Sequence, residues 1–189
     1  MYYRLMLKLR HDAGFIVIGA VLLAAIPLRA AVADSAANGF TVKLELNIQA
    51  PPQEVYRRLV QNVGDWWNSM HTFSGDAHNL SIDDKAMGCF CEKLPSGGSV
   101  RHMEVVYADP GKKLVLSGAL GPLQSIAATG SMIIQLSAAG EGTKLSVVYT
   151  LTGYVAAGMN TWAAPVDSVL TEQFTRLKSL IENGKAATK

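Results

Sequence analysis

The feature that most restricts the fold of this chain is a long amphipathic segment near its C-terminus. Apolar residues recur at spacings of three and four between Trp162 and Ile181, which is the pattern of a helix with one buried face. Asn183 and Gly184 are expected to end the helix, because glycine readily adopts the left-handed conformation found at helix ends. A helix of about 20 residues is about 30 Å long, so it needs a large apolar surface to pack against.

That surface is predicted to be an antiparallel sheet. Residues 40–48 alternate apolar and polar side chains, as in a half-buried strand, and two prolines end it. Short helices are predicted over residues 53–60 and 63–68. Further strands, separated by turn residues, are predicted at residues 80–83, 88–94, 99–108, 113–119, 127–138 and 143–152. The predicted fold is therefore α+β: a curved seven-stranded antiparallel sheet that grips the C-terminal helix, with two short helices after the first strand.

The N-terminus has the three parts of a secretory signal. Basic residues open it, residues 13–28 are uncharged, and Ala31-Val32-Ala33 has the small-residue pattern of a cleavage site. We predict a signal peptide at residues 1–33 and an exported domain, periplasmic or secreted, at residues 34–189. The uncharged segment is shorter than the about 20 residues of a spanning helix, so no stable membrane span is expected after cleavage. The alternative, suggested by the atypical Arg29, is an uncleaved N-terminal membrane anchor.

The charge balance excludes one class of partner once the signal is set aside. Residues 1–33 hold four of the 17 basic residues and one of the 15 acidic residues, which leaves 13 basic and 14 acidic residues in the exported part. The sequence pI of about 8.5 therefore comes from the signal. No basic stripe remains for nucleic acid, and a domain of this length can bury a core without a metal or disulfide.

Several local patterns resemble the START/pollen-allergen-type helix-grip superfamily, also called SRPBCC, which includes polyketide cyclase/dehydrase-like proteins. The resemblance covers about residues 40–183 and is carried by residues 50–56 (APPQEVY), residues 63–67 (VGDWW), residues 88–92, Gln173, Phe174 and Leu177. It implies a cavity for a hydrophobic ligand. It does not imply one activity, because members of the superfamily transport lipids, bind hormones, cyclise polyketides or assist chaperones.

Aromatic and methionine side chains are the candidate ligand contacts, because they offer apolar bodies and, in Tyr and Trp, a polar tip. The predicted binding set is Trp66, Trp67, His71, Tyr107, Tyr149, Tyr154, Met159 and Trp162.

Residues 71–76 (HTFSGD) combine a histidine, a serine and an aspartate, the residue types of nucleophilic catalysis. Side chains this close in one loop rarely converge, so we interpret the segment as a loop in which Ser74 and Asp76 stabilise turns. A polar lining at the mouth of the cavity is the alternative. If the protein is an enzyme, His71 and Asp76 are the acid–base candidates of this segment.

Glu92 and His102 form the second candidate acid–base set, on two strands of one predicted hairpin. A two-residue turn places Glu92 opposite Arg101 as an ion pair, whereas a three-residue turn places it opposite His102. The alternating apolar residues of the second strand are expected to face inward, which directs His102 outward; they are Met103, Val105 and Tyr107.

Cys89 and Cys91 share one side of a predicted strand. A disulfide across one residue of a regular strand would be strained, and no second ligand pair at metal spacing appears. We interpret the two cysteines as small buried apolar residues, although export to an oxidising compartment leaves their redox state open.

The sequence thus predicts an exported protein that binds a small hydrophobic or amphipathic ligand between sheet and helix, with no metal or cofactor. The first alternative is a cofactor-free cyclase, hydratase or isomerase that uses the acid–base candidates in the same cavity. The second is a scaffold that binds a protein partner of unknown identity.

Overall fold

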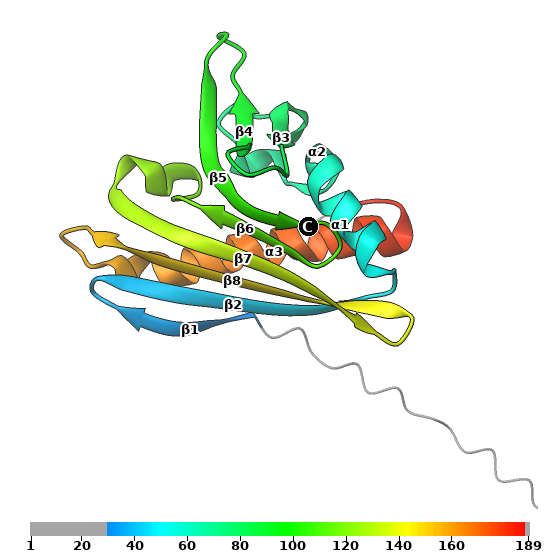
Figure 1. Ribbon diagram of the computed structural model, residues 1–189. Helices are drawn as coiled ribbons and strands as arrows, with labels where there is room; N and C mark the ends of the chain where they lie inside the picture. Colours follow the sequence, from blue (N-terminus) through cyan, green and yellow to red (C-terminus); the bar gives the residue numbers. More distant parts are fainter. Residues whose placement is uncertain (1–29, 188–189) are drawn as a thin grey trace, which may run out of the picture.

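The computed structural model describes residues 30–187, so the apolar segment of the predicted signal lies outside the described residues. The described chain has an α+β fold, in which one antiparallel sheet of eight strands packs on a long C-terminal helix (Figure 1). The strands are β1 (Ala30–Ala36), β2 (Gly39–Ile48), β3 (Leu80–Ile82), β4 (Cys89–Lys93), β5 (Ser99–Asp109), β6 (Lys113–Ser117), β7 (Ala127–Ala139) and β8 (Gly142–Tyr154). The helices are α1 (Pro52–Gln61), α2 (Val63–Trp66) and α3 (Ala163–Asn183), with short 3-10 turns η1 (Ser69–His71), η2 (Ala77–Asn79), η3 (Gly121–Ser125) and η4 (Met159–Trp162).

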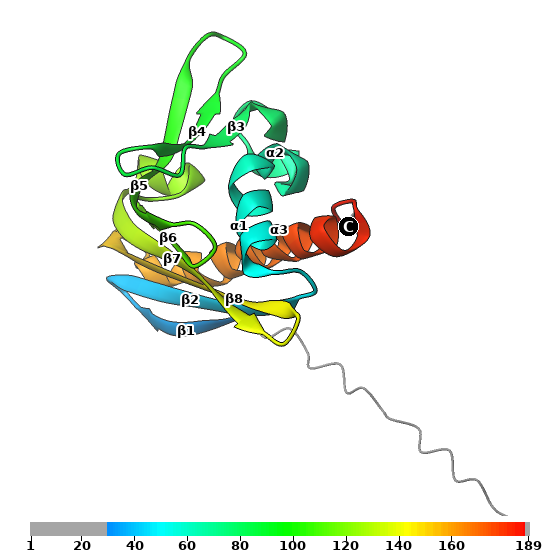
Figure 2. The same cartoon turned by 45° about the vertical axis from the view of Figure 1, so that its right-hand side comes forward.

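The strands follow the order β1-β2-β8-β7-β6-β5-β4-β3, and all neighbours are antiparallel. The sheet curves around α3, while α1 and α2 pack near the C-terminal half of that helix (Figures 1 and 2). Helix α3 ends at Asn183, and the next residue, Gly184, has a φ of 73°, which confirms the predicted helix end. The predicted long helix, two short helices and antiparallel sheet are confirmed.

Alternation of apolar residues sets the inner face of the sheet. In β2, Phe40, Val42 and the apolar residues that follow at every second position are buried, and the polar residues between them mostly face solvent. The predicted inward residues of β7 and β8 are buried as well: Met132, Ile134, Leu136, Leu145, Val147, Tyr149 and Leu151. The period of two in the sequence therefore predicted the buried faces of β2, β7 and β8 correctly.

Within residues 30–187 the sheet has eight strands, where seven were predicted. The additional strand is β1, which pairs with β2 through a register that shifts between Val32 and Asp34. The small residues of β1 do not alternate between apolar and polar, so no strand was predicted from the sequence. A cleavage site was predicted there instead. Cleavage after Ala33, as predicted, would fall inside β1.

Two irregularities in β5 change which side chains face the core. Between β4 and β5, Phe90 pairs with Met103 but Cys91 pairs with Arg101, which leaves His102 as an extra residue on β5. A bulge of this kind turns two successive side chains to one face, and His102 and Met103 are both buried. The expectation that His102 faces outward was wrong for this reason.

A second bulge lies between β5 and β6, where Val105 pairs with Leu116 and Tyr107 pairs with Val115. The extra residue reverses the alternation, so Tyr107 is 49% exposed. The expectation that Tyr107 faces inward was therefore also wrong. The ring of Tyr107 instead lies under the ammonium group of Lys113, 5.6 Å from the ring centre.

The turn between β4 and β5 is longer than either turn length considered from the sequence. Lys93 pairs with Ser99, so the loop spans residues 94–98, and Glu92 pairs with Val100. Neither predicted register holds, and the contact between Glu92 and His102 arises from the bulge. Within residues 30–187, no helix combines the length and apolar character needed to cross a membrane.

Candidate functional site

A pocket of about 310 Å³ opens between the N-terminal half of α3, the turns η1 and η3, and the inner face of the sheet. Most of its wall is apolar, which is typical of small-molecule sites. The lining residues are Trp67, Met70, His71, Thr72, Phe73, His102, Leu120, Gly121, Pro122, Leu123, Tyr149, Trp162, Pro165, Val166, Val169 and Leu170.

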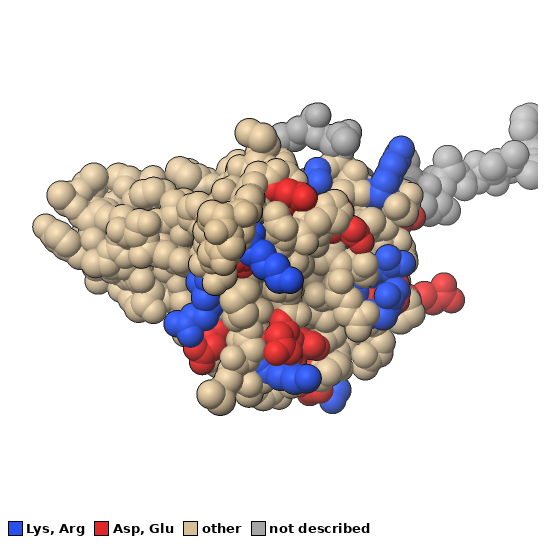
Figure 3. Space-filling model, turned by 90° about the horizontal axis from the view of Figure 1, so that it is seen from above, with Lys and Arg blue, Asp and Glu red and all other residues tan. Residues whose placement is uncertain are grey.

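The end of the molecule that holds η3 and η4 is uncharged over long stretches of chain. Residues 114–134 and 145–166 contain no Asp, Glu, Lys or Arg. Figure 3 shows this end without charged side chains on the visible face, whereas charged residues of both signs gather at the opposite end. The surroundings of the pocket therefore suit a ligand whose body carries no charge.

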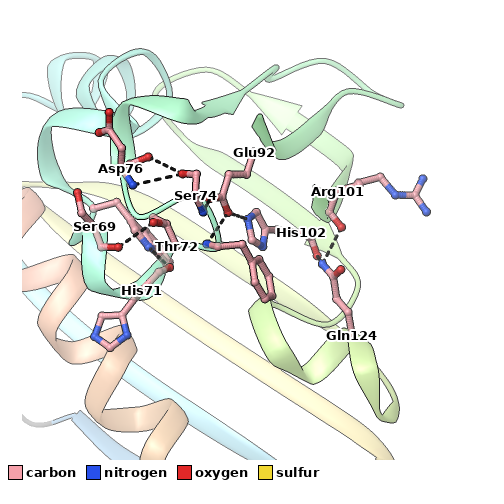
Figure 4. A network of polar contacts seen from close by, with 11 residues as sticks. Ser69, His71, Thr72, Ser74, Asp76, Glu92, Arg101, His102 and Gln124 are labelled. Carbon is pink, nitrogen blue, oxygen red and sulfur yellow. Dashed lines mark hydrogen bonds and ion pairs between the residues drawn. The ribbon is translucent and has the colours of Figure 1, made fainter. Parts of the chain in front are cut away.

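The main polar feature of the pocket is a buried carboxylate–imidazole pair. Oε2 of Glu92 lies 2.9 Å from Nε2 of His102, and the residues are only 1% and 4% exposed. Figure 4 shows Glu92 between His102 and the loop that follows η1. Because buried charges need partners, this pair is a costly arrangement that demands a structural or functional reason.

Glu92 also holds the loop that borders the pocket. Its carboxylate accepts hydrogen bonds from the backbone N–H of Phe73 at 3.2 Å and of Ser74 at 2.5 Å. The Phe73 ring stacks on the His102 imidazole, with centroids 5.9 Å apart and planes 9° apart. The Glu92 carboxylate thus holds both the His102 ring and the loop at Phe73 and Ser74 in place beside the pocket.

The backbone at the bulge is fixed by η3. The side-chain amide of Gln124 donates to the carbonyl oxygens of Arg101, at 2.7 Å, and His102, at 3.1 Å (Figure 4). These are the two β5 residues at the register shift. Gln124 therefore satisfies carbonyl groups at the irregular point of the strand and positions the imidazole.

The environment determines the protonation of the pair. Burial by itself raises the pKa of Glu92, but hydrogen bonds from Ser74, Phe73 and His102 outweigh it and hold that pKa below its ordinary value. Burial lowers the pKa of His102, and the neighbouring Glu92 offsets this only in part. The favoured state at neutral pH is therefore an ionised carboxylate beside a neutral imidazole.

Tyr149 contributes a second buried polar atom to the pocket wall. Its hydroxyl oxygen accepts a hydrogen bond from the backbone N–H of Leu120 at 3.0 Å. Burial raises the pKa of Tyr149 to about 12, although the Leu120 hydrogen bond lowers it slightly. Tyr149 thus keeps its proton at physiological pH and has an O–H to donate.

His71 reaches the pocket from η1. Its Nε2 lies 3.5 Å from Oε2 of Glu172 on α3, and the amide of Asn68 donates to the other oxygen of Glu172 at 2.5 Å. The His71 side chain is about one third exposed. It therefore belongs to the mouth of the pocket and connects η1 to α3.

The other candidate of that loop, Asp76, lies outside the pocket. Its carboxylate accepts from the backbone N–H of His78 at 3.0 Å, and its own N–H donates to the hydroxyl of Ser74. Figure 4 shows the Asp76 side chain directed away from His102. These contacts match the interpretation of residues 71–76 as a hydrogen-bonded loop.

The predicted binding set divides among three locations. Trp67, His71, Tyr149 and Trp162 line the pocket. Trp66 and Met159 are buried in the hydrophobic core and do not reach the pocket wall. Tyr107 and Tyr154 are 49% and 75% exposed, so neither contributes to the pocket.

Other pocket residues were not anticipated. Thr72, Phe73 and Leu120 come from irregular loops and Leu123 from the short turn η3, where the sequence has no periodicity that indicates a direction. The one signal available was the absence of charge across η3 and η4.

Cys89 and Cys91 form a disulfide, which corrects their interpretation as two free apolar residues. Their Cα atoms are 5.4 Å apart, whereas two residues of extended strand span about 6.6 Å. The local shortening of β4 coincides with the bulge opposite it, so the strand at this point is not regular. No group of three or more potential metal ligands occurs within the described residues.

Comparison with known proteins identifies the class of fold. No protein-family profile matches the chain, and no curated protein matches it at a significant level. Solved structures do match. A conserved protein of unknown function, EF2215 from Enterococcus faecalis, is 18% identical with a TM-score of 0.60, over 84% of this chain and 80% of that chain.

Two further matches come from named proteins. DynU16, from the dynemicin biosynthetic locus, is 18% identical with a TM-score of 0.56, over 77% of this chain and 48% of that chain. CalU16 from Micromonospora echinospora is 14% identical with a TM-score of 0.52, over 82% and 84% of the two chains. These similarities are consistent with a helix-grip, polyketide cyclase-like fold, and at this level of identity they establish the fold alone.

Proposed function

We propose that this chain is an exported protein that binds a small, mostly apolar molecule in the pocket between α3 and the sheet. The observation that carries the proposal is the pocket itself, about 310 Å³ in volume and lined largely by apolar side chains. Ligand pockets usually measure about 300–1,000 Å³, so this volume favours a molecule of one or two rings.

The arrangement of charge supports the same conclusion. Two acidic side chains near the pocket have a histidine partner, Glu92 with His102 and Glu172 with His71. The adjoining turns η3 and η4 are uncharged. A neutral molecule would lose little hydration in such a pocket, whereas an anion would lose its hydration close to the Glu92 carboxylate.

Binding of propylbenzene, followed by backbone amide NMR, tests the proposal. Amide shifts are expected at pocket residues such as Leu120 and Trp162. The variant Val169→Trp, which fills the pocket from α3, is expected to abolish them. Ser168→Trp is the matched control, because Ser168 is exposed on the same helix, and it should bind normally. Shifts scattered over the surface, or unchanged in Val169→Trp, would refute the proposal.

A second candidate function is proton transfer to or from the bound molecule, and the buried Glu92–His102 pair favours it. A neutral imidazole oriented by a carboxylate is a common general base, and Tyr149 could donate a hydrogen bond to a ligand oxygen. The test is exchange of the acidic C–H protons of 2-indanone in heavy water, followed by NMR. Exchange that is no faster with the wild type than with His102→Gln would rule out this function.

A further inference from the structure

One ring nitrogen of His102 has no hydrogen-bond partner among the described residues, and this atom constrains what the pocket recognises. Nδ1 of His102 is buried and makes no hydrogen bond to any described residue. The ring is otherwise enclosed, because Phe73 stacks on it and the Phe90 ring lies 5.1 Å away. Nδ1 itself is closed off from solvent, but His102 forms part of the pocket wall, so a molecule that displaces the wall beside the ring can become the partner of Nδ1.

The hydrogen bonds around Glu92 decide which kind of group Nδ1 needs. The Glu92 carboxylate accepts from two backbone N–H groups, of Phe73 and Ser74. An ionised carboxylate can only accept, so the third contact, with Nε2 of His102, requires the proton on Nε2. In a neutral imidazole the other nitrogen is then an acceptor.

From this geometry we infer that the ligand carries a hydroxyl group, phenolic or alcoholic, that donates to Nδ1 of His102. The inference rests on the proposed binding function and names the chemical class of the ligand. A pure hydrocarbon or an ether leaves Nδ1 unsatisfied. A carboxylate would place a negative charge close to the Nδ1 lone pair and the Glu92 carboxylate.

Three other polar side chains of the wall differ in what they can offer a ligand: one is engaged as a donor, one lies at the mouth, and one has a proton to donate. The hydroxyl of Thr72 donates to the carbonyl of Ser69 at 2.7 Å, and His71 lies beside Glu172. The hydroxyl of Tyr149 accepts from Leu120 and has its proton to give. A ligand hydroxyl can donate its proton to Nδ1 of His102. The oxygen of the same hydroxyl can then accept a hydrogen bond from a donor such as Tyr149.

A pair of probes of nearly equal shape separates this inference from simple apolar binding. Calorimetric titration of the full chain would compare 4-propylphenol with its methyl ether, 4-propylanisole. The phenol is expected to bind about tenfold more tightly, which is the usual effect of one hydrogen bond. In His102→Leu the two probes should bind alike.

Because His102→Leu removes a partner of buried Glu92 and could fail to fold, a measurement on the wild type is needed as well. Long-range proton–nitrogen NMR of the imidazole rings should show His102 protonated on Nε2. Its Nδ1 resonance should move with the phenol and stay in place with the ether. His78, which is exposed and outside the pocket, is the internal control.

The outcomes are distinct. A tighter phenol together with a shifted Nδ1 resonance supports the inference. Equal binding of the two probes, an unmoved Nδ1 resonance, or a His102 ring protonated on Nδ1 overturns it and leaves the apolar pocket standing. Failure of both probes and of propylbenzene to bind overturns the proposed function, and the inference with it.

Discussion

The Nε2 atom of His102 lies 2.9 Å from Oε2 of Glu92 across two strands whose register shifts at that point. Without the bulge, His102 would alternate to the outer face of the sheet. With it, a histidine and a glutamate meet inside the molecule, beside an apolar pocket. The bulge is therefore the local irregularity that creates the polar end of the candidate site, as bulges near functional sites often do.

The carboxylate of Glu92 is expected to contribute strongly to stability. In Glu92→Gln, the two backbone donors and His102 lose a charged acceptor, which should lower the free energy of unfolding by about 2–3 kcal/mol. Glu104→Gln on the same sheet is the control, because Glu104 is solvent-accessible and paired with Arg101 at 2.9 Å; it should cost less than about 1 kcal/mol. Urea unfolding measures both, and equal losses would contradict the role of Glu92.

The pair also predicts how stability depends on pH. The pKa of Glu92 and the pKa of His102 are both lowered in the folded protein, so the unfolded chain binds more protons at mildly acidic pH. Stability should therefore fall as pH drops below the ordinary histidine value of 6.5, and fall further below the ordinary glutamate value of 4.5.

The measurement is the urea midpoint across this pH range. The double variant Glu92→Gln, His102→Phe removes both groups and should lose most of the slope above pH 4.5. A double variant with the same slope as the wild type would show that other groups control the acid response.

The disulfide between Cys89 and Cys91 should stabilise the protein modestly. It closes a very small loop, so its removal in Cys89→Ser, Cys91→Ser is expected to cost about 1–2 kcal/mol. Dithiothreitol should lower the unfolding midpoint of the wild type and leave that of the double variant unchanged. Labelling of two free thiols in the native, unreduced protein would contradict the bridge.

The N-terminus of the mature protein remains a prediction with a structural consequence. The sequence predicts cleavage before Asp34, which would leave Asp34–Ala36 of β1 and remove Val32, a residue that packs against the core. Intact-mass measurement of protein from its own host is expected to give a chain that begins at Asp34. A chain that begins at Met1 would favour the membrane-anchored alternative.

Periodicity in the sequence was enough to predict the regular part of the fold. The alternation in β2, β7 and β8 and the spacing of apolar residues along α3 identified the sheet, its inner face and the helix that it packs on. Strand β1 was not predicted because its small residues have no alternating apolar pattern. Pattern arguments work where one face is uniformly apolar, and they fail elsewhere.

The candidate site was only partly predictable for the same reason. Glu92 and His102 were recognised as candidates by residue type, but nothing in the apolar alternation of β5 marks the extra residue that turns His102 inward. The predicted inward direction of Tyr107 was wrong because the sequence does not indicate the second bulge. The pocket also needs η1, η3 and α3 to meet, and such long-range proximity leaves no local signal.

Native mass spectrometry of the protein purified from its own host tests the central claim most directly. The account predicts a co-purifying neutral molecule of low mass that bears a hydroxyl group, bound to the wild type and to Ser168→Trp but absent from Val169→Trp. Repeated preparations in which the wild type carries no such molecule, or in which Val169→Trp carries the same one, would contradict the claim.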